Sequence, residues 1–100
     1  MHLTLFTPYE IAQQIAHRAQ QKRLFLNFSQ QSLSKQSGVS LSVLKKFERT
    51  GKISLESLLK LALTLGALDD FAVLFKETAP EAFPTLDALL KQKTRKRGRK

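Results

Sequence analysis

The stretch from Ser29 to Arg49 constrains the fold most, because its pattern predicts two short helices joined by a tight turn. Ser29 can cap the first helix, in which Leu33 is the main apolar anchor. Gly38 permits the left-handed backbone that ends a helix in a sharp turn, and Ser40 can cap the second helix. The stretch therefore predicts two short helices that meet at a tight turn.

The second of these helices has a narrow apolar side and a polar, basic side. Leu44 and Phe47 are three residues apart and therefore share one face. The residues left to point elsewhere are Leu41, Ser42, Lys45, Lys46 and Arg49. A short helix of this kind suits the major groove of duplex DNA. An ordinary amphipathic helix bundle would explain the leucine and phenylalanine, but not why the exposed side is small and basic.

A recognisable pattern of residues extends well beyond the turn. Its residues are Ser29-Gln30-Gln31, Leu33-Ser34, Gly38-Val39-Ser40, Leu44, Phe47-Glu48-Arg49, Gly51-Lys52, the run from Ser54 to Ala62, and Leu65-Gly66. In type and spacing this set resembles the Cro/cI, or lambda-repressor-like, helix-turn-helix family. The resemblance implies an all-α, five-helix DNA-binding domain. Asn27 stands where the family often has glycine, and Thr50 lengthens the following loop by one residue.

The same resemblance assigns roles to residues of this chain. Base-reading residues would be Ser40, Leu41, Ser42 and Lys46, and phosphate-binding residues Gln30, Lys35, Lys45, Arg49 and Lys52. Lys46 could donate to guanine acceptors, and Leu41 could contact a thymine methyl group. Arg23 would pair with Glu48, partly buried, and hold the first helix against the third.

Local patterns divide the chain into four parts. Residues 1–7 form an N-terminal arm, residues 8–78 the DNA-binding domain, residues 79–90 an extension with a short helix, and residues 91–100 a basic, disordered tail. The first helix is expected from Pro8 to about Leu24, because Thr7 and Glu10 can form a capping box. A loop over residues 50–54 leads to a fourth helix that ends at Gly66. Its inward residues are expected to be Leu55, Leu58, Leu59, Ala62 and Leu65.

A fifth helix is expected to begin near Asp69 and Asp70, where negative charge complements the helix dipole. Its wide apolar surface would either close the core or form a homodimer contact, as the last helix commonly does in the family that the chain resembles. The dimer is favoured because three of the seven phenylalanines lie in or just after this element, and a small core cannot easily bury all of them. The residues expected on this dimer or partner surface are Phe71, Phe75, Phe83 and Leu86. The expected DNA target is a near-palindromic double-stranded operator.

The net charge of +9 lies mostly at the C-terminus, where residues 91–100 hold seven cations and no acid. Residues 1–90 therefore contribute only +2, since nine less seven is two. Nucleic acid, an anionic membrane surface and an acidic protein are all possible partners on charge alone. The tail cations include Arg95, Lys96, Arg97, Arg99 and Lys100. The segment Arg97-Gly98-Arg99 weakly resembles an AT-hook, and the tail is expected to add phosphate attraction, although it could simply aid solubility.

Several classes of function find no support in the sequence. The chain has no cysteine and only two histidines, so no thiolate metal site or cysteine nucleophile is expected, and His17 is expected at the surface. No cofactor is expected. A Gly-rich phosphate loop and a nucleophile elbow are also missing, so no enzyme is predicted. The sequence shows no secretory signal and no apolar stretch long enough to span a bilayer, and we expect a cytoplasmic protein without a membrane partner.

A narrower resemblance concerns the segment from Phe83 to Lys91 and the Lys/Arg-rich end. This combination is similar to HipB-type DNA-binding proteins of toxin-antitoxin systems whose toxin is a Hip-type serine/threonine kinase. It implies an autorepressor that also binds the kinase toxin or a companion antitoxin subunit. The alternative is a protein-interaction module that keeps the fold but does not read DNA sequence.

Overall fold

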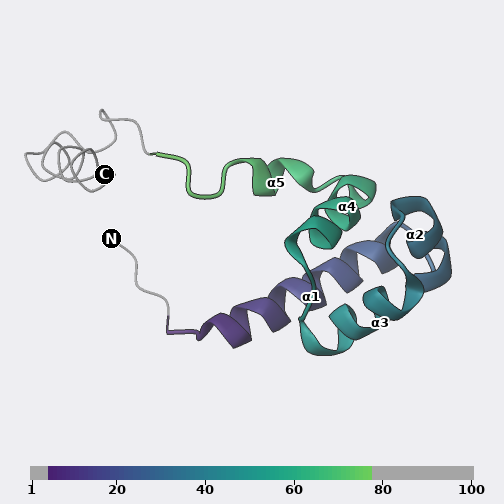
Figure 1. Ribbon diagram of the computed structural model, residues 1–100, viewed down its shortest axis with the longest axis horizontal. Coiled ribbons are helices and arrows are strands. Elements are labelled where there is room, and N and C mark those ends of the chain that lie inside the picture. Colours follow the sequence, from purple (N-terminus) through teal and green to yellow (C-terminus); the bar gives the residue numbers. More distant parts are fainter. Residues whose placement is uncertain (1–4, 78–100) are drawn as a thin grey trace, which may run out of the picture.

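The computed structural model describes residues 5–77 and is all-helical over that range. The helices are α1 (Pro8–Phe25), α2 (Gln30–Ser37), α3 (Leu41–Thr50), α4 (Leu55–Leu65) and α5 (Leu68–Ala72). Figure 1 shows α1 as the longest helix, in contact with α3 on one side and with α4 on the other, while α2 closes one end. The predicted fold class, an all-α five-helix domain, is confirmed for the described residues.

The helix starts follow directly from the sequence. Thr7 and Glu10 form the expected capping box, with the Glu10 amide 3.1 Å from Thr7 Oγ1 and the Thr7 amide 2.9 Å from Glu10 Oε1. Serine side chains cap the next three helices by accepting a backbone N–H from the third helical residue; these are Ser29, Ser40 and Ser54. Asn27, just after α1, adopts the left-handed conformation that its position predicts, with φ of 63°.

Gly51, at the end of α3, is required for two reasons. Its φ of 84° lies in the left-handed region, and a Cβ atom built there would be 3.0 Å from the carbonyl carbon and oxygen of Ala12 in α1. Gly38 has a similar φ of 80°, but a Cβ atom there would meet no atom within 4 Å. The end of α3 therefore packs against the backbone of α1, and a side chain at residue 51 would separate the two helices.

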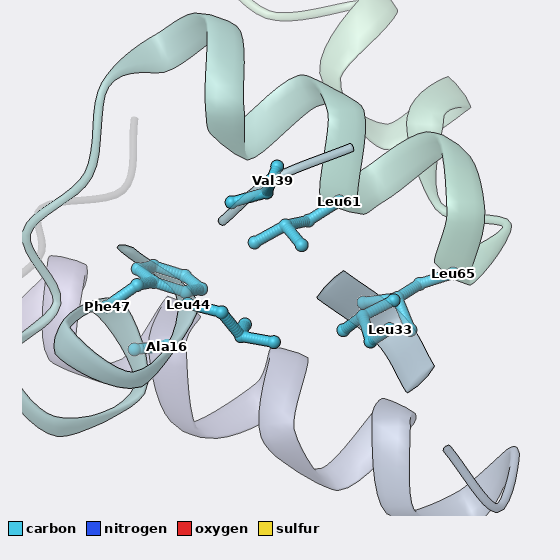
Figure 2. Close-up of a cluster of buried hydrophobic side chains, with 7 residues drawn as sticks. All are labelled: Ala16, Leu33, Val39, Leu44, Phe47, Leu61 and Leu65. Carbon is cyan, nitrogen blue, oxygen red and sulfur yellow. The ribbon is translucent and has the colours of Figure 1, made fainter. Parts of the chain in front are cut away.

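The core lies where α1, α2, α3 and α4 converge. Figure 2 shows seven buried side chains pointing into this common centre: Ala16, Leu33, Val39, Leu44, Phe47, Leu61 and Leu65. Leu33, Leu44, Phe47 and Leu61 are each only 1% exposed. Val39, in the turn between α2 and α3, contributes to the same cluster, so the motif is anchored on both sides of its turn.

The predicted inward face of α4 is partly wrong. Leu55 is 64% exposed, whereas Leu61, which was not predicted to face inward, is buried. The buried stripe follows the spacing Leu58, Leu61, Ala62 and Leu65, which is the phase that meets the other helices. Leu55 is the first residue of α4 and lies at the edge of the domain, where no neighbouring helix covers it.

Helix boundaries also differ from the predictions in three places. Helix α1 continues to Phe25, one residue beyond the expected end, and Thr50 belongs to α3 instead of the loop. Thr50 Oγ1 donates to the Lys46 carbonyl at 2.8 Å, which keeps it in the last turn. Helix α5 ends already at Ala72, and Phe75 beyond it is fully exposed with φ of 63°. Phe83, Leu86, the expected helix within residues 79–90 and the basic tail lie outside the described residues.

Candidate nucleic-acid interface

The turn between α2 and α3 is held by a compact set of hydrogen bonds. Ser34 Oγ donates to the Val39 carbonyl at 2.6 Å, and the Gly38 amide donates to the Ser34 carbonyl at 3.0 Å. The Val39 amide in turn donates to Ser37 Oγ at 3.1 Å. These bonds satisfy the polar groups of the turn locally, while Val39 itself is buried. The relative orientation of α2 and α3 is therefore fixed by the motif itself.

The second helix of the motif, α3, turns its apolar side to the core and its other side to solvent. Leu44 and Phe47 are buried, and Leu41 is partly exposed at the first helical position. The exposed side chains of α3 and its cap are Ser40, Ser42, Val43, Lys45, Lys46 and Arg49. The structure thus brings the predicted base-reading residues together at and near the start of one helix, with the cations further along.

The charges around α3 are of one sign. Five exposed cations lie in the motif or directly after it. Lys35 is in α2, Lys45, Lys46 and Arg49 are in α3, and Lys52 follows α3. None of the five makes an ion pair with another residue in the described range 5–77. Glu48 is the only acid between Leu24 and Leu55, and its side chain is 4% exposed and already paired. The surface around α3 is therefore positively charged without compensation, as binding of a polyanion requires.

Glu48 anchors α3 to the rest of the domain through a buried polar network. Arg23 of α1 donates to it through Nε at 2.7 Å and Nη2 at 3.1 Å, the bidentate arrangement that suits a guanidinium and a carboxylate. Arg23 Nη1 also donates to the Phe28 carbonyl at 2.8 Å. Gln30 of α2 adds a third bond, from Nε2 to Glu48 Oε1 at 2.9 Å. One carboxylate therefore connects α1, α2 and α3.

Two of the residues with expected DNA contacts have intramolecular partners in the structure. The Gln30 side chain is bonded to Glu48, and Ser40 Oγ accepts the Val43 amide at 3.2 Å as the cap of α3. Ser40 lies 3.4 Å from Ser42, oxygen to oxygen. Gln30 keeps a second amide hydrogen for a further contact, and Ser40 keeps its hydroxyl hydrogen when Ser42 is the donor of that pair. In addition, the backbone N–H groups of Gln30 and Gln31 occupy the first turn of α2, where a helix supplies no acceptor.

Val43 is an exposed residue of α3 that sequence reasoning did not single out. It is 37% exposed, although it precedes the fully buried Leu44. Consecutive residues of an α-helix are rotated by about 100°, so the burial of Leu44 and Phe47 already placed Val43 at the margin of the buried stripe. Val43 and Leu41 lie at opposite margins of this stripe, because their side chains point about 160° apart around the helix.

Two other kinds of feature, a metal site and a membrane-spanning helix, are not found among the described residues. No group of three or more His, Cys, Asp or Glu side chains within residues 5–77 is arranged to hold a metal ion. In the same range, no helix has the length and apolar character needed to cross a membrane. The turn, the exposed side of α3 and the surrounding cations together define a helix-turn-helix domain.

Comparison with known proteins agrees with this geometry. A family model described as helix-turn-helix matches residues 20–71, which is slightly more than half of the chain. The chain belongs to this family, whose Cro/cI-type members carry DNA-binding regulatory domains and are typically not enzymes. The matched range begins within α1 and ends within α5, so it includes the whole motif and its supporting core. No curated protein was found to match the sequence.

Proposed function

We propose that the protein is a sequence-specific transcriptional regulator that inserts α3 into the major groove of operator DNA. The observation that carries this proposal is the uncompensated positive charge around α3, where five exposed cations surround a single buried, paired acid. A helix with small residues at its start can approach base edges closely, and cations beside it can bind the flanking phosphates.

Base reading is assigned to the exposed first turns of α3. Ser40 and Ser42 would bond base edges, Lys46 would donate to guanine, and Leu41 would contact a thymine methyl group. The phosphate-binding residues would be Gln30, Lys35, Lys45, Arg49 and Lys52. Gln30 would bind a phosphate with its backbone N–H and its second amide hydrogen, while its bond to Glu48 keeps the start of α2 fixed.

We propose that the protein binds as a homodimer to half-sites about 34 Å apart, one turn of DNA. The exposed apolar residues at the end of the described chain support this proposal. Val73 and Leu74 are each more than half exposed, and Phe75 is fully exposed. Burial of these side chains in a dimer would remove apolar surface from water, at about 25 cal/mol per Å².

The resemblance of the C-terminal sequence to HipB-type proteins supports a more specific proposal. The protein would repress a toxin-antitoxin operon in the cytoplasm and also bind a Hip-type kinase toxin or a companion antitoxin subunit. The surfaces available for such a partner include Leu24, Phe25 and Leu26, an exposed apolar run at the end of α1 that lies off the α3 surface. This role requires an operon that also encodes the partner.

The test is binding of the purified protein to a labelled fragment of its own promoter, against scrambled competitor DNA at fixed physiological salt. Wild type is compared with Lys46→Ala and with a chain that ends at Leu90. Lys60→Ala is the matched control, because it removes one exposed cation from α4 instead of α3. We expect Lys46→Ala to lose about 1–3 kcal/mol of preference for the promoter, and Lys60→Ala to retain it.

The truncated chain separates affinity from sequence reading. Removal of the tail should weaken binding to both DNAs alike and reduce the slope of log K against log salt by about 0.9 for each phosphate that the tail neutralises in the full-length complex. If wild type shows no preference for its promoter over scrambled DNA, the regulator proposal fails. The alternative, an interaction module on the same fold, would then be favoured, and neutralising Lys45, Lys46 and Arg49 would have no effect on partner binding.

A further inference from the structure

An apolar groove lies between α1, α4 and α5, and no residue of α3 lines it. Helices α1, α4 and α5 line this groove, which has a volume of about 380 Å³. Its apolar lining includes Ile15, Ala19, Leu58, Leu65, Phe71 and Leu74. The charged residues at its edge are Arg18 and Lys22 from α1 and Asp70 from α5. Helix α5, with only five residues and no side-chain cap, covers the groove incompletely.

We propose that this groove binds residues 83–90 of the same chain. This stretch contains the apolar side chains Phe83, Leu86, Leu89 and Leu90. Leu86, Leu89 and Leu90 have the i, i+3, i+4 spacing that forms one face of a helix, so three leucines could enter the groove together. The inference does not depend on the contact between α3 and DNA, because no residue of α3 lines the groove.

Chain length permits this contact. The described residues end at Glu77, three residues after Leu74, which itself lines the groove. Phe83 is six positions beyond Glu77, and an extended chain of that length reaches about 20 Å. Pro80 and Pro84 favour turns in this connection. The segment is therefore tethered beside the groove, which gives it a high effective concentration there.

Charge also favours this segment over other parts of the chain. Residues 78–90 contain two acids, Glu81 and Asp87, and no cation. Arg18 and Lys22 at the groove edge have no ion-pair partner within the described part of the chain, so Asp87 can approach them as the leucines enter. The basic tail, residues 91–100, has no apolar residue and like charge to this edge, and it is unsuited to the groove.

Disulfide trapping in the full-length protein tests the proposal. The chain has no cysteine, so Arg18→Cys or Lys22→Cys combined with Asp87→Cys gives the only two thiols. Oxidation at low micromolar protein should form an intramolecular disulfide in at least one pair, about tenfold faster than in a control pair. The control combines Asp87→Cys with Lys45→Cys, which lies on the α3 surface. Circular dichroism checks that each variant is folded.

A second readout detects groove occupancy without cysteines. In the full-length protein, Leu89→Asp should shift the methyl resonances of Ala19 and Ala62, which line the groove, and leave that of Ala12 unchanged. Ala12 is suitable because it does not line the groove and lies about two helical turns from Ala19, with its backbone beside Gly51. Trapping no faster than the control, or unchanged Ala19 and Ala62 resonances, overturns the proposal. Disulfides formed only between two molecules overturn it as well, since the groove would then hold a second copy's segment.

Discussion

The buried pair of Arg23 and Glu48 gives the sharpest prediction about stability. Their side chains are only 8% and 4% exposed, and two hydrogen bonds join them. Removal of either residue would therefore leave a buried charge without its partner and lower the free energy of unfolding. Arg23→Leu would leave the Glu48 carboxylate with one neutral donor, the Gln30 amide. Removal of one partner from a buried ion pair typically costs about 3–5 kcal/mol, and we expect this loss for either single variant.

The double variant Arg23→Leu, Glu48→Leu should be much less destabilised than the two single losses added together. It removes both buried charges at once and leaves only the Phe28 carbonyl and the Gln30 amide to find new partners. Direct contact between the two residues predicts a coupling energy of about 2–3 kcal/mol in a double-mutant cycle. Urea unfolding followed by circular dichroism, with linear extrapolation to water, measures all four free energies.

The exposed pair of Glu56 and Lys60 is the matched control for this cycle. Its charged atoms are 3.7 Å apart, and the side chains of Lys60 and Glu56 are 50% and 82% exposed. Solvent screens such a pair, so its coupling energy should be only about 0.3–0.5 kcal/mol. Additivity within about 0.5 kcal/mol for Arg23 and Glu48, no more than the control, would refute the view that burial makes this pair interdependent.

Two further comparisons test the packing. Gly51→Ala should be more destabilising than Gly38→Ala, because both residues have positive φ but only a side chain at Gly51 would meet the backbone of α1. We expect a cost of about 1–2 kcal/mol at Gly38 from φ alone, and a further 1–3 kcal/mol at Gly51 from overpacking; equal melting temperatures would contradict this. Leu61→Ala should lose about 2–5 kcal/mol, whereas Leu55→Ala should change stability by about 0.5 kcal/mol or less, since only Leu61 is buried. Thermal unfolding of the four variants measures both differences.

The sequence predicted the helix starts, the turn and the exposed side of α3, because each depends on residues that are close together in the chain. Helix starts at Thr7, Ser29, Ser40 and Ser54 follow from hydrogen bonds between residues three apart, so a local pattern is sufficient to find them. The turn after α2 follows from Gly38 in the same way. The exposed, basic side of α3 could also be predicted, because helical periodicity fixes which side chains oppose Leu44 and Phe47.

The choice of buried residues in α4 depended on the tertiary structure. The pattern from Leu55 to Leu65 contains six leucines, and periodicity allows more than one buried stripe through such a run. The position of α4 against α1 and α2 selects the stripe that includes Leu61 and leaves Leu55 in solvent. The short length of α5 is a similar case, because the Asp69–Asp70 start gives no indication of where the helix ends.

The sequence by itself therefore determined the all-α class, the helix-turn-helix motif and the cations around α3, since each depends on interactions within one or two helical turns. The tertiary structure decided how the helices meet. It shows that Gly51 must lack a side chain because Ala12 lies beside it, and that Gln30 joins Arg23 at Glu48. It also reveals the groove between α1, α4 and α5. These features involve residues up to 59 positions apart, such as Ile15 and Leu74, and local patterns carry no information on contacts between residues so far apart in the sequence.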